Sequence, residues 1–188
     1  MSNKNLTEIP DDLPTNLIGL NLSENRMKKI ENNSFNGLSS LEELFLNSNG
    51  IKKIEDNSFC RLSSLKHLNL EENMIKKIEN NSFNGLSSLE ELFLNSNEIK
   101  KIEDNSFCRL SSLKHLILSG NPLQIIENNT FNGLISLKIL ILNQDIEFIE
   151  KKSFDELSSL EDLILPEYIN KKKLEKLPRR ILNLISYI

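Results

Sequence analysis

The sequence predicts a repeat solenoid of the α/β class, in which short coils stack side by side, with a parallel β-sheet on the concave side and an irregular convex side. Two observations support this prediction. A Leu-x-x-Leu-x-Leu segment recurs at a step of 24 residues, and each segment is followed by a polar stretch, an apolar pair, a Phe and a Leu. One such unit cannot bury its apolar face alone, so the units must stack on one another.

The leucine segments are the predicted strands of the sheet. Successive side chains of a strand alternate between its two faces, so the period-2 leucines point inward and the residues between them point outward. The six sets are Leu17/Leu20/Leu22, Leu41/Leu44/Leu46, Leu65/Leu68/Leu70, Leu89/Leu92/Leu94, Leu113/Leu116/Leu118 and Leu137/Leu140/Leu142.

Two further columns follow from the same step. An Asn turns the chain after each of the first five strands, and a Phe on the return path fills the wider convex side, where each Phe buries roughly 150–250 Å². The turn residues are Asn25, Asn49, Asn73, Asn97 and Asn121, and the aromatic residues are Phe35, Phe59, Phe83, Phe107, Phe131 and Phe154.

Both ends of a solenoid need a cover, because an open end exposes core leucines. At the N-terminal end, Leu6, Ile9 and Leu13 are the expected cover. At the C-terminal end the step shortens to 23 residues, and the turn Asn is replaced by Asp145 and then by Tyr168.

The last residues predict a helix. Apolar residues stand at 181, 184, 185 and 188, which is helical spacing, and Pro178 would lie near the first turn. We expect this segment to form a capping helix over the last coil. A helix that binds a membrane or a partner is the alternative interpretation.

Read together, the columns give the pattern L-x-x-L-x-L-x-x-N-x-I-x-x-I-x-x-x-x-F-x-x-L-x-x, which resembles the 24-residue type of the leucine-rich repeat family, as in Toll-like receptors and variable lymphocyte receptors. The resemblance implies a right-handed coil, a ladder of buried Asn amides bonded to the adjacent coil, and protein binding. The length of 188 residues fits one domain over 1–188 without a remainder for a second. We expect an N-terminal cap at 1–16 without the family's cap cysteines, six repeats at 17–159, and a degenerate seventh repeat with the helical cap at 160–188.

Composition argues against several kinds of partner and location. The formal net charge is −4 and the pI is near 5.4, so no global basic field favours nucleic acid or an anionic membrane. No apolar stretch has the length of a signal peptide or a membrane span. We expect a cytoplasmic protein, or a secreted one whose leader has been removed.

The two cysteines, Cys60 and Cys108, occupy the same slot two repeats apart. At about 4.8 Å per stacked strand they would lie roughly 10 Å apart, beyond the Cα separation of about 7 Å that a disulfide allows. Both are therefore predicted to be free thiols.

No catalytic motif is present, so we expect a non-enzymatic protein without a cofactor. The sequence has no phosphate-binding Gly-rich loop, no Gly-x-Ser-x-Gly and no Cys-x-x-Cys, and His67 and His115 are its only histidines. These two with Glu91 are a weak candidate for a zinc site. Their backbones would be about 10 Å apart, and no fourth ligand is suggested.

Charged residues alternate in sign across the outward side of the predicted strands, which predicts cross-strand pairs worth about 0.2–1 kcal/mol each. The second-position column is Ile18, Glu42, Lys66, Glu90, Lys114, Lys138 and Glu161, and the third-position column is Gly19, Glu43, His67, Glu91, His115, Ile139 and Asp162.

The fifth-position column is more informative, because it becomes apolar towards the C-terminal end. It reads Asn21, Phe45, Asn69, Phe93, Ile117, Ile141 and Ile164. An exposed apolar strip is seldom kept by a monomer without a use. We predict a protein-binding surface with the anchors Phe45, Phe93, Ile117, Ile141 and Ile164, widened by Ile139, and with orienting residues Glu43, His67, Glu91, His115 and Asp162. A homodimer interface is the alternative, and the C-terminal tail could also cover the strip.

Lysine pairs recur on the convex side beside a column of glutamates, and we interpret this face as solvated. A polyanion site is the alternative, but the glutamates and the net negative charge count against it. The lysines are Lys28/Lys29, Lys52/Lys53, Lys76/Lys77 and Lys100/Lys101, and the glutamates are Glu31, Glu55, Glu79, Glu103, Glu127 and Glu150.

Overall fold

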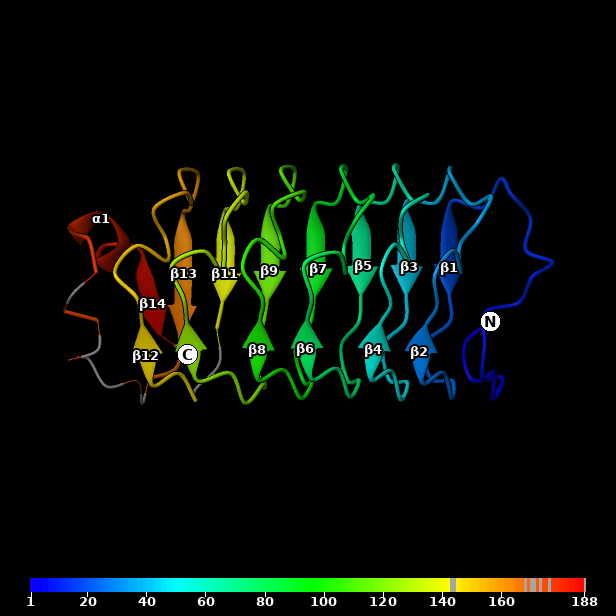
Figure 1. The fold of residues 1–188 in the computed structure, drawn as a ribbon, viewed down its shortest axis with the longest axis horizontal. Helices are drawn as coiled ribbons and strands as arrows, with labels where there is room; N and C mark the ends of the chain where they lie inside the picture. Colours follow the sequence, from blue (N-terminus) through cyan, green and yellow to red (C-terminus); the bar gives the residue numbers. More distant parts are fainter. Residues whose placement is uncertain (143–144, 168, 170–171, 173, 176, 188) are drawn as a thin grey trace.

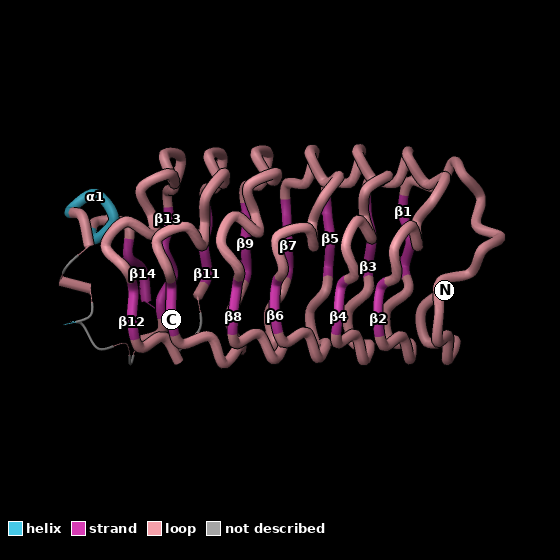
Figure 2. The backbone as a smooth tube through the Cα atoms, in the orientation of Figure 1, coloured by secondary structure: helices cyan, strands magenta, loops and turns pink. Residues whose placement is uncertain are grey.

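The computed structural model describes residues 1–142, 145–167, 169, 172, 174–175 and 177–187. Over these residues the chain winds through coils that stack along one axis, with the N-terminal segment at one end and a short helix near the other (Figure 1). Each coil contributes a strand to one row, and most coils contribute a shorter strand to a second row (Figure 2). This arrangement confirms the predicted solenoid.

The first row is a parallel sheet of eight strands among the described residues. Its strands in spatial order are β1 (Gly19–Asn21), β3 (Glu43–Phe45), β5 (His67–Asn69), β7 (Glu91–Phe93), β9 (His115–Ile117), β11 (Ile139–Ile141), β13 (Asp162–Leu165) and β14 (Ile185–Tyr187). The second row forms the pairs β2 (Lys29–Ile30) with β4 (Lys53–Ile54), β6 (Lys77–Ile78) with β8 (Lys101–Ile102), and β10 (Ile125–Ile126) with β12 (Phe148–Ile149).

Strand register follows the sequence repeat directly. Leu44 pairs with Leu68, 24 residues on, whereas Leu140 pairs with Leu163, 23 residues on. The shortened last step therefore leaves the sheet in register, and the missing residue is taken from a connection between strands.

Two apolar columns fill the core. The inward leucines are fully buried; Leu68, Leu92 and Leu116 have 0% exposure. The Phe residues stack on one another from Phe35 to Phe154, with ring centroids 5.7–6.4 Å apart and interplanar angles of 9–17°. Each ring between these two ends thus packs against the rings of both neighbouring coils, and the predicted second column is confirmed.

The buried Asn side chains join each coil to the one before it. Asn73 accepts a hydrogen bond from the Ile51 backbone N–H at 3.0 Å. Its amide group donates to the carbonyl of Leu46 in the preceding coil at 3.0 Å, and to that of Leu70 in its own coil at 3.1 Å. Asn49, Asn97 and Asn121 repeat this pattern.

The ladder ends on the N-terminal segment. Asn25 accepts hydrogen bonds from the backbone N–H groups of Lys4 and Leu6, at 3.0 and 2.9 Å, where the other ladder residues use the preceding coil. Leu6 packs against the core with Ile9 and Leu13. The predicted N-terminal cover is therefore held by the same amide interaction as the repeats.

Serines form a second connection between coils, which we did not predict. The hydroxyl of Ser58 donates to the carbonyl of Ile30 in the preceding coil at 2.9 Å. Ser106 and Ser153 make the equivalent bond at 3.3 and 3.2 Å. These buried hydroxyls satisfy carbonyl groups that would otherwise be desolvated without a partner.

Glycine is required where neighbouring coils touch. A Cβ atom on Gly85 would lie 2.5 Å from the Cα of Cys60, and one on Gly133 would lie at the same distance from the Cα of Cys108. Both glycines also have positive φ, at +95° and +85°. Phe-Asn-Gly-Leu turns alternate with Phe-Cys-Arg-Leu turns along the chain. The glycine of the first type leaves space for the backbone of the second type in the preceding coil.

The C-terminal cover differs from the prediction. Only Arg179–Leu182 is helical (α1), with Pro178 at its N-cap. Ile185, expected on the helix, begins β14, which pairs in parallel with β13. The edge of β13 offers unpaired backbone groups, and a strand satisfies these where a helix cannot. Ile188 and Tyr168 lie outside the described residues, and Asp145 is exposed.

The single turn of helix still closes the last coil. Ile181 is fully buried, and the guanidinium of Arg180 donates to the backbone carbonyls of Leu157 at 2.9 Å and Phe154 at 3.1 Å.

Among the described residues, no helix is long and apolar enough to cross a membrane.

We predict that Asn73→Leu lowers the free energy of unfolding by about 3 kcal/mol or more, because it removes the partners of several buried backbone groups at about 1–3 kcal/mol each. Lys76→Leu should change it by no more than about 0.5 kcal/mol, since Lys76 is exposed. Denaturant melts of the two variants measure both effects. Equal midpoints would contradict the ladder.

The cysteines provide a second test of the register. Both are free thiols in the structure, and Cys108 is exposed whereas Cys60 is half-buried and lies with its sulfur 3.6 Å from Asn33 Oδ1. Thiol reagents should titrate two equivalents in denatured protein and should label Cys108 faster in native protein. A titre near zero in a monomer would mean that the coils are out of register.

Candidate functional site

The outward side of the eight-stranded sheet, called the sheet face below, carries the residues predicted for binding. In the seven strands of this sheet from β1 to β13, a buried leucine lies between two residues that point out, as in β5, where His67 and Asn69 flank buried Leu68. Strands in register place equivalent residues side by side. The sheet face is therefore a set of straight columns, and side chains from coils far apart in sequence lie next to each other.

Opposite charges in the second-position column form ion pairs, as predicted. Lys66 pairs with Glu42 at 2.8 Å, and Lys114 pairs with Glu90 at 2.7 Å. Lys138 pairs with Glu161 at 2.8 Å. The hydrogen bond to Glu42 raises the pKa of Lys66, and the bond from Lys114 lowers the pKa of Glu90. The pairs are solvated, so they fix side-chain positions more than they stabilise the fold.

Glu91 lies between two histidines in the middle of the sheet face. One carboxylate oxygen lies 3.0 Å from Nδ1 of His67, and the other lies 3.2 Å from Nδ1 of His115. An ionised carboxylate only accepts hydrogen bonds, so both Nδ1 atoms carry a proton in this arrangement. Across the part of the chain that the structure describes, no group of three or more His, Cys, Asp or Glu is placed to hold a metal ion.

Four members of the predicted apolar strip form an unbroken line. Phe93 pairs in register with Ile117, Ile117 with Ile141, and Ile141 with Ile164. Ile139 widens this line next to Ile141. We call these five residues the apolar strip.

Phe45 stands apart from the apolar strip, because Asn69 lies between it and Phe93. Each member of the strip is half-buried, since its neighbours on adjacent strands cover its flanks. The strip is thus less exposed than the sequence led us to expect. Of the predicted charged residues, Glu43 and Asp162 are exposed. Asp162 lies on β13, which carries the last residue of the strip, whereas Glu43 lies on β3, two strands before the first.

Two large apolar residues of the C-terminal half are more exposed than the strip and lie on other strands. Ile125 and Phe148 pair in register on β10 and β12, and they are 52% and 49% exposed. Sequence reasoning missed this pair. The signal was available, because both residues occupy the slot that holds Lys29, Lys53 and Lys77 in earlier coils.

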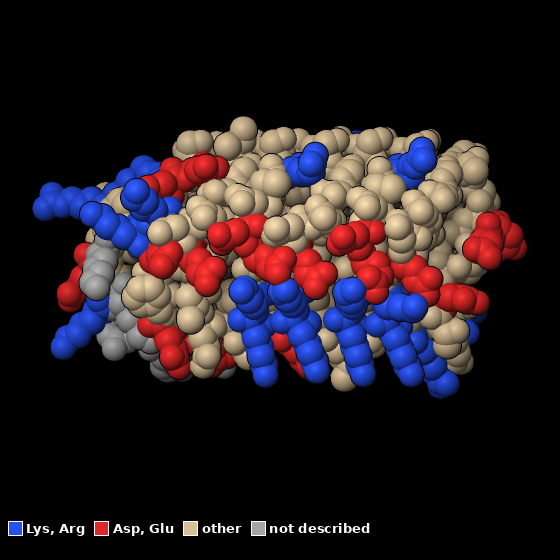
Figure 3. Space-filling model, viewed as in Figure 1, with Lys and Arg blue, Asp and Glu red and all other residues tan. Residues whose placement is uncertain are grey.

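The lysine columns form a row of parallel side chains beside a row of acidic ones (Figure 3). Lys29 pairs with Glu31 and Lys53 with Glu55, each at 2.8 Å, and Lys77 pairs with Glu103. These hydrogen bonds raise the pKa of all three lysines. One of the two lysine columns is therefore largely neutralised by its neighbours.

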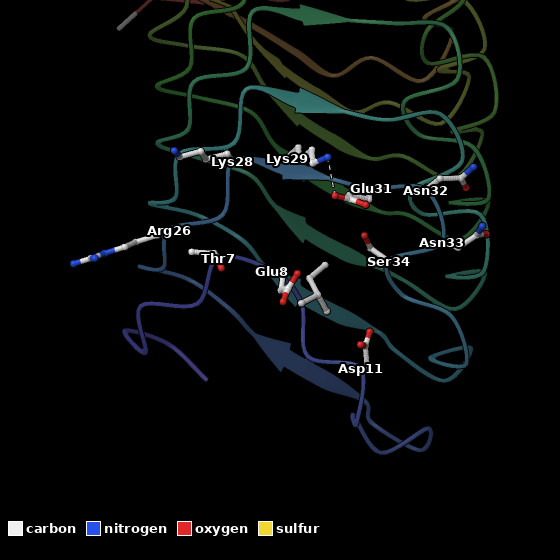
Figure 4. Close-up of a pocket in the computed structure, with 11 residues that line it drawn as sticks. Thr7, Glu8, Asp11, Arg26, Lys28, Lys29, Glu31, Asn32, Asn33 and Ser34 are labelled. Carbon is white, nitrogen blue, oxygen red and sulfur yellow. Dashed lines mark ion pairs between the residues drawn. The ribbon is translucent and has the colours of Figure 1, made fainter.

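A pocket of about 540 Å³ lies where the N-terminal segment separates from the first coil (Figure 4). At the same place in later coils, backbone hydrogen bonds connect one coil to the next, as from the Lys52 N–H to the Lys28 carbonyl at 2.8 Å. Within the pocket wall Lys29 is paired with Glu31, and the side chains of Arg26 and Lys28 extend away from the pocket. Its charged groups do not converge on one point, so it does not resemble a catalytic centre.

Comparison with known proteins agrees with this architecture. The crystal structure of a TLR13–ssRNA13 complex is similar over 87% of this chain, with a TM-score of 0.74 and 31% sequence identity. This chain spans 24% of that chain's length. In all, 363 solved chains match, whereas no curated protein does.

The family comparison identifies the repeat itself. A family model described as Leucine rich repeat matches residues 1–51, 15–75, 39–99 and 73–123, and a second model of the same description matches residues 112–137. These ranges carry the ladder asparagines from Asn25 to Asn121 and the strand leucines up to Leu137. The chain therefore belongs to the leucine-rich repeat family.

Proposed function

We propose that the protein is a non-enzymatic binding module that uses its sheet face to hold a protein partner. The observation that carries this proposal is the apolar strip, which crosses β7, β9, β11 and β13 without interruption. Apolar residues at the centre of an interface, ringed by polar ones, provide most of the binding free energy in protein complexes. Phe45 would add a separate anchor on β3.

The charged residues beside the strip would orient the partner. Glu91 is fixed by both histidines, and Lys114 is fixed by Glu90. Side chains already held in one position lose little conformational entropy when a partner arrives. Glu43 on β3 and Asp162 on β13 are exposed, so they could pair with cationic groups of a ligand.

A foreign protein fits the sheet face better than a nucleic acid does. The similar TLR13 structure is a complex with ssRNA. In this chain, however, the lysines in the second-position column are already bound to glutamates, and Glu43, Glu91 and Asp162 add negative charge. Phosphate binding needs unpaired cationic groups.

Self-association through the same strip is the second candidate. The strip runs straight across the sheet, so two copies related by a twofold axis could bury it against each other. This arrangement would need no foreign ligand. Light scattering over a concentration series separates it from the first proposal, because only self-association raises the mass of the purified protein.

The test is the double substitution Ile117→Glu with Ile141→Glu. Both side chains point out of the sheet, so we expect the variant to fold, with partner capture or dimerisation weakened by at least about 2 kcal/mol per residue. Ile125→Glu with Ile135→Glu is a matched control, because both residues are about half exposed, at 52% and 51%, on other surfaces.

Far-ultraviolet circular dichroism and a thermal melt should confirm that both variants keep the fold. Pull-down, and light scattering for the dimer, then measure association. If the control pair abolishes association and the sheet-face pair leaves it intact, the binding surface is not the apolar strip.

A further inference from the structure

The row of short strands carries one column of surface side chains, which is cationic in the first four coils and apolar in the next two. One column holds Lys29, Lys53, Lys77 and Lys101 on β2, β4, β6 and β8, and then Ile125 and Phe148 on β10 and β12. Neighbouring strands are about 4.8 Å apart. A cationic stretch about 15 Å long therefore leads directly into an exposed apolar pair.

A second column beside the first is free to contact anions. It consists of Lys28, Lys52, Lys76 and Lys100, and we call it the lysine ridge. All four are exposed. Among the described residues, the only ion pair of the ridge joins Lys76 to Glu98, at 3.8 Å between largely exposed side chains.

The glutamates are placed so that they do not cover the ridge. In each of the four coils that carry the ridge, the order along the chain is ridge lysine, inner lysine, buried Ile and then Glu, as in Lys52, Lys53, Ile54 and Glu55. The glutamate bonds the inner lysine, so its charge lies on the far side of that residue from the ridge. Arg26 extends outward on the same side as Lys28 and lengthens the ridge at its N-terminal end (Figure 4).

Ile125 and Phe148 are the apolar end of this edge. They are 52% and 49% exposed, whereas the residues of the apolar strip are half-buried, and these two lie side by side. Four earlier coils have lysine in the position of these two residues. Adjacent exposed apolar side chains are seldom kept on a protein surface unless they contact a partner.

We propose that this edge docks on an anionic phospholipid bilayer, with the lysine ridge on the headgroups and with Ile125 and Phe148 inserted at the interface. Stable peripheral binding needs two signals, and a basic patch with an apolar insertion provides both. The sheet face lies on other strands and stays available for a protein partner. The chain as a whole is acidic, so the attraction is local to this edge.

A single-stranded nucleic acid fits the same edge less well. Such ligands bind through aromatic side chains that stack on successive bases between the cationic contacts. No aromatic residue stands among the four coils of the ridge in this column, and Phe148 lies beyond its end. A flat bilayer, by contrast, accommodates a straight ridge and an apolar end together.

The test is flotation of the full chain with phosphatidylcholine vesicles that do or do not contain phosphatidylserine. The protein should bind only the anionic vesicles, and binding should fall as salt is raised. Lys52→Glu with Lys100→Glu should weaken binding at least tenfold, because each lysine near an anionic surface contributes about fivefold. Phe148→Ser should weaken binding severalfold and leave its salt dependence unchanged.

The matched control is Arg61→Glu with Arg109→Glu, which makes the same change in net charge at two exposed residues in the loops before β5 and β9. It should bind as the unmodified protein does. Absence of binding to anionic vesicles at low salt would overturn the proposal, and so would equal loss in the control. Displacement of the protein from vesicles by an oligothymidylate that binds more tightly would assign the edge to nucleic acid instead.

Discussion

The structure depends on one constraint: buried backbone groups at each turn must find partners. From Asn25 to Asn121 they find them through an asparagine side chain shared with the coil or segment before it. Asn73 illustrates this, because it bonds an N–H of one coil and carbonyls of two coils at once. A buried polar group without a partner costs about 1–3 kcal/mol. A coil is therefore stable only in a stack, and the straight columns of the surface are a consequence of that stacking.

The ends of the solenoid satisfy the same constraint in different ways. The N-terminal segment supplies backbone N–H groups to Asn25 and apolar side chains to the core. The C-terminal segment supplies a strand for the edge of the sheet and an arginine for two open carbonyls. Both solutions use backbone hydrogen bonds as well as apolar cover, so neither end is a simple hydrophobic lid.

Most of the fold could be predicted from the sequence because a 24-residue step fixes which residues face inward. The strands, the Phe stack and the cross-strand pairs Lys66–Glu42 and Lys114–Glu90 all follow from that step. The C-terminal end could not be predicted in this way. The apolar spacing of residues 181, 184 and 185 is typical of a helix, but the unpaired edge of the sheet favours a strand. Burial of the apolar strip was also underestimated, since single-column reasoning leaves out the shielding by neighbouring strands.

The central claim is that the asparagine ladder holds the coils together, and amide hydrogen exchange tests it most directly. The backbone N–H groups of Met27, Ile51, Ile75 and Ile99 each donate to a ladder oxygen at 3.0–3.1 Å, and they lie in loops outside any strand. In native protein these four amides should exchange as slowly as those of the middle leucines of the sheet strands. Exchange at the rate of the exposed loop amides would contradict the account.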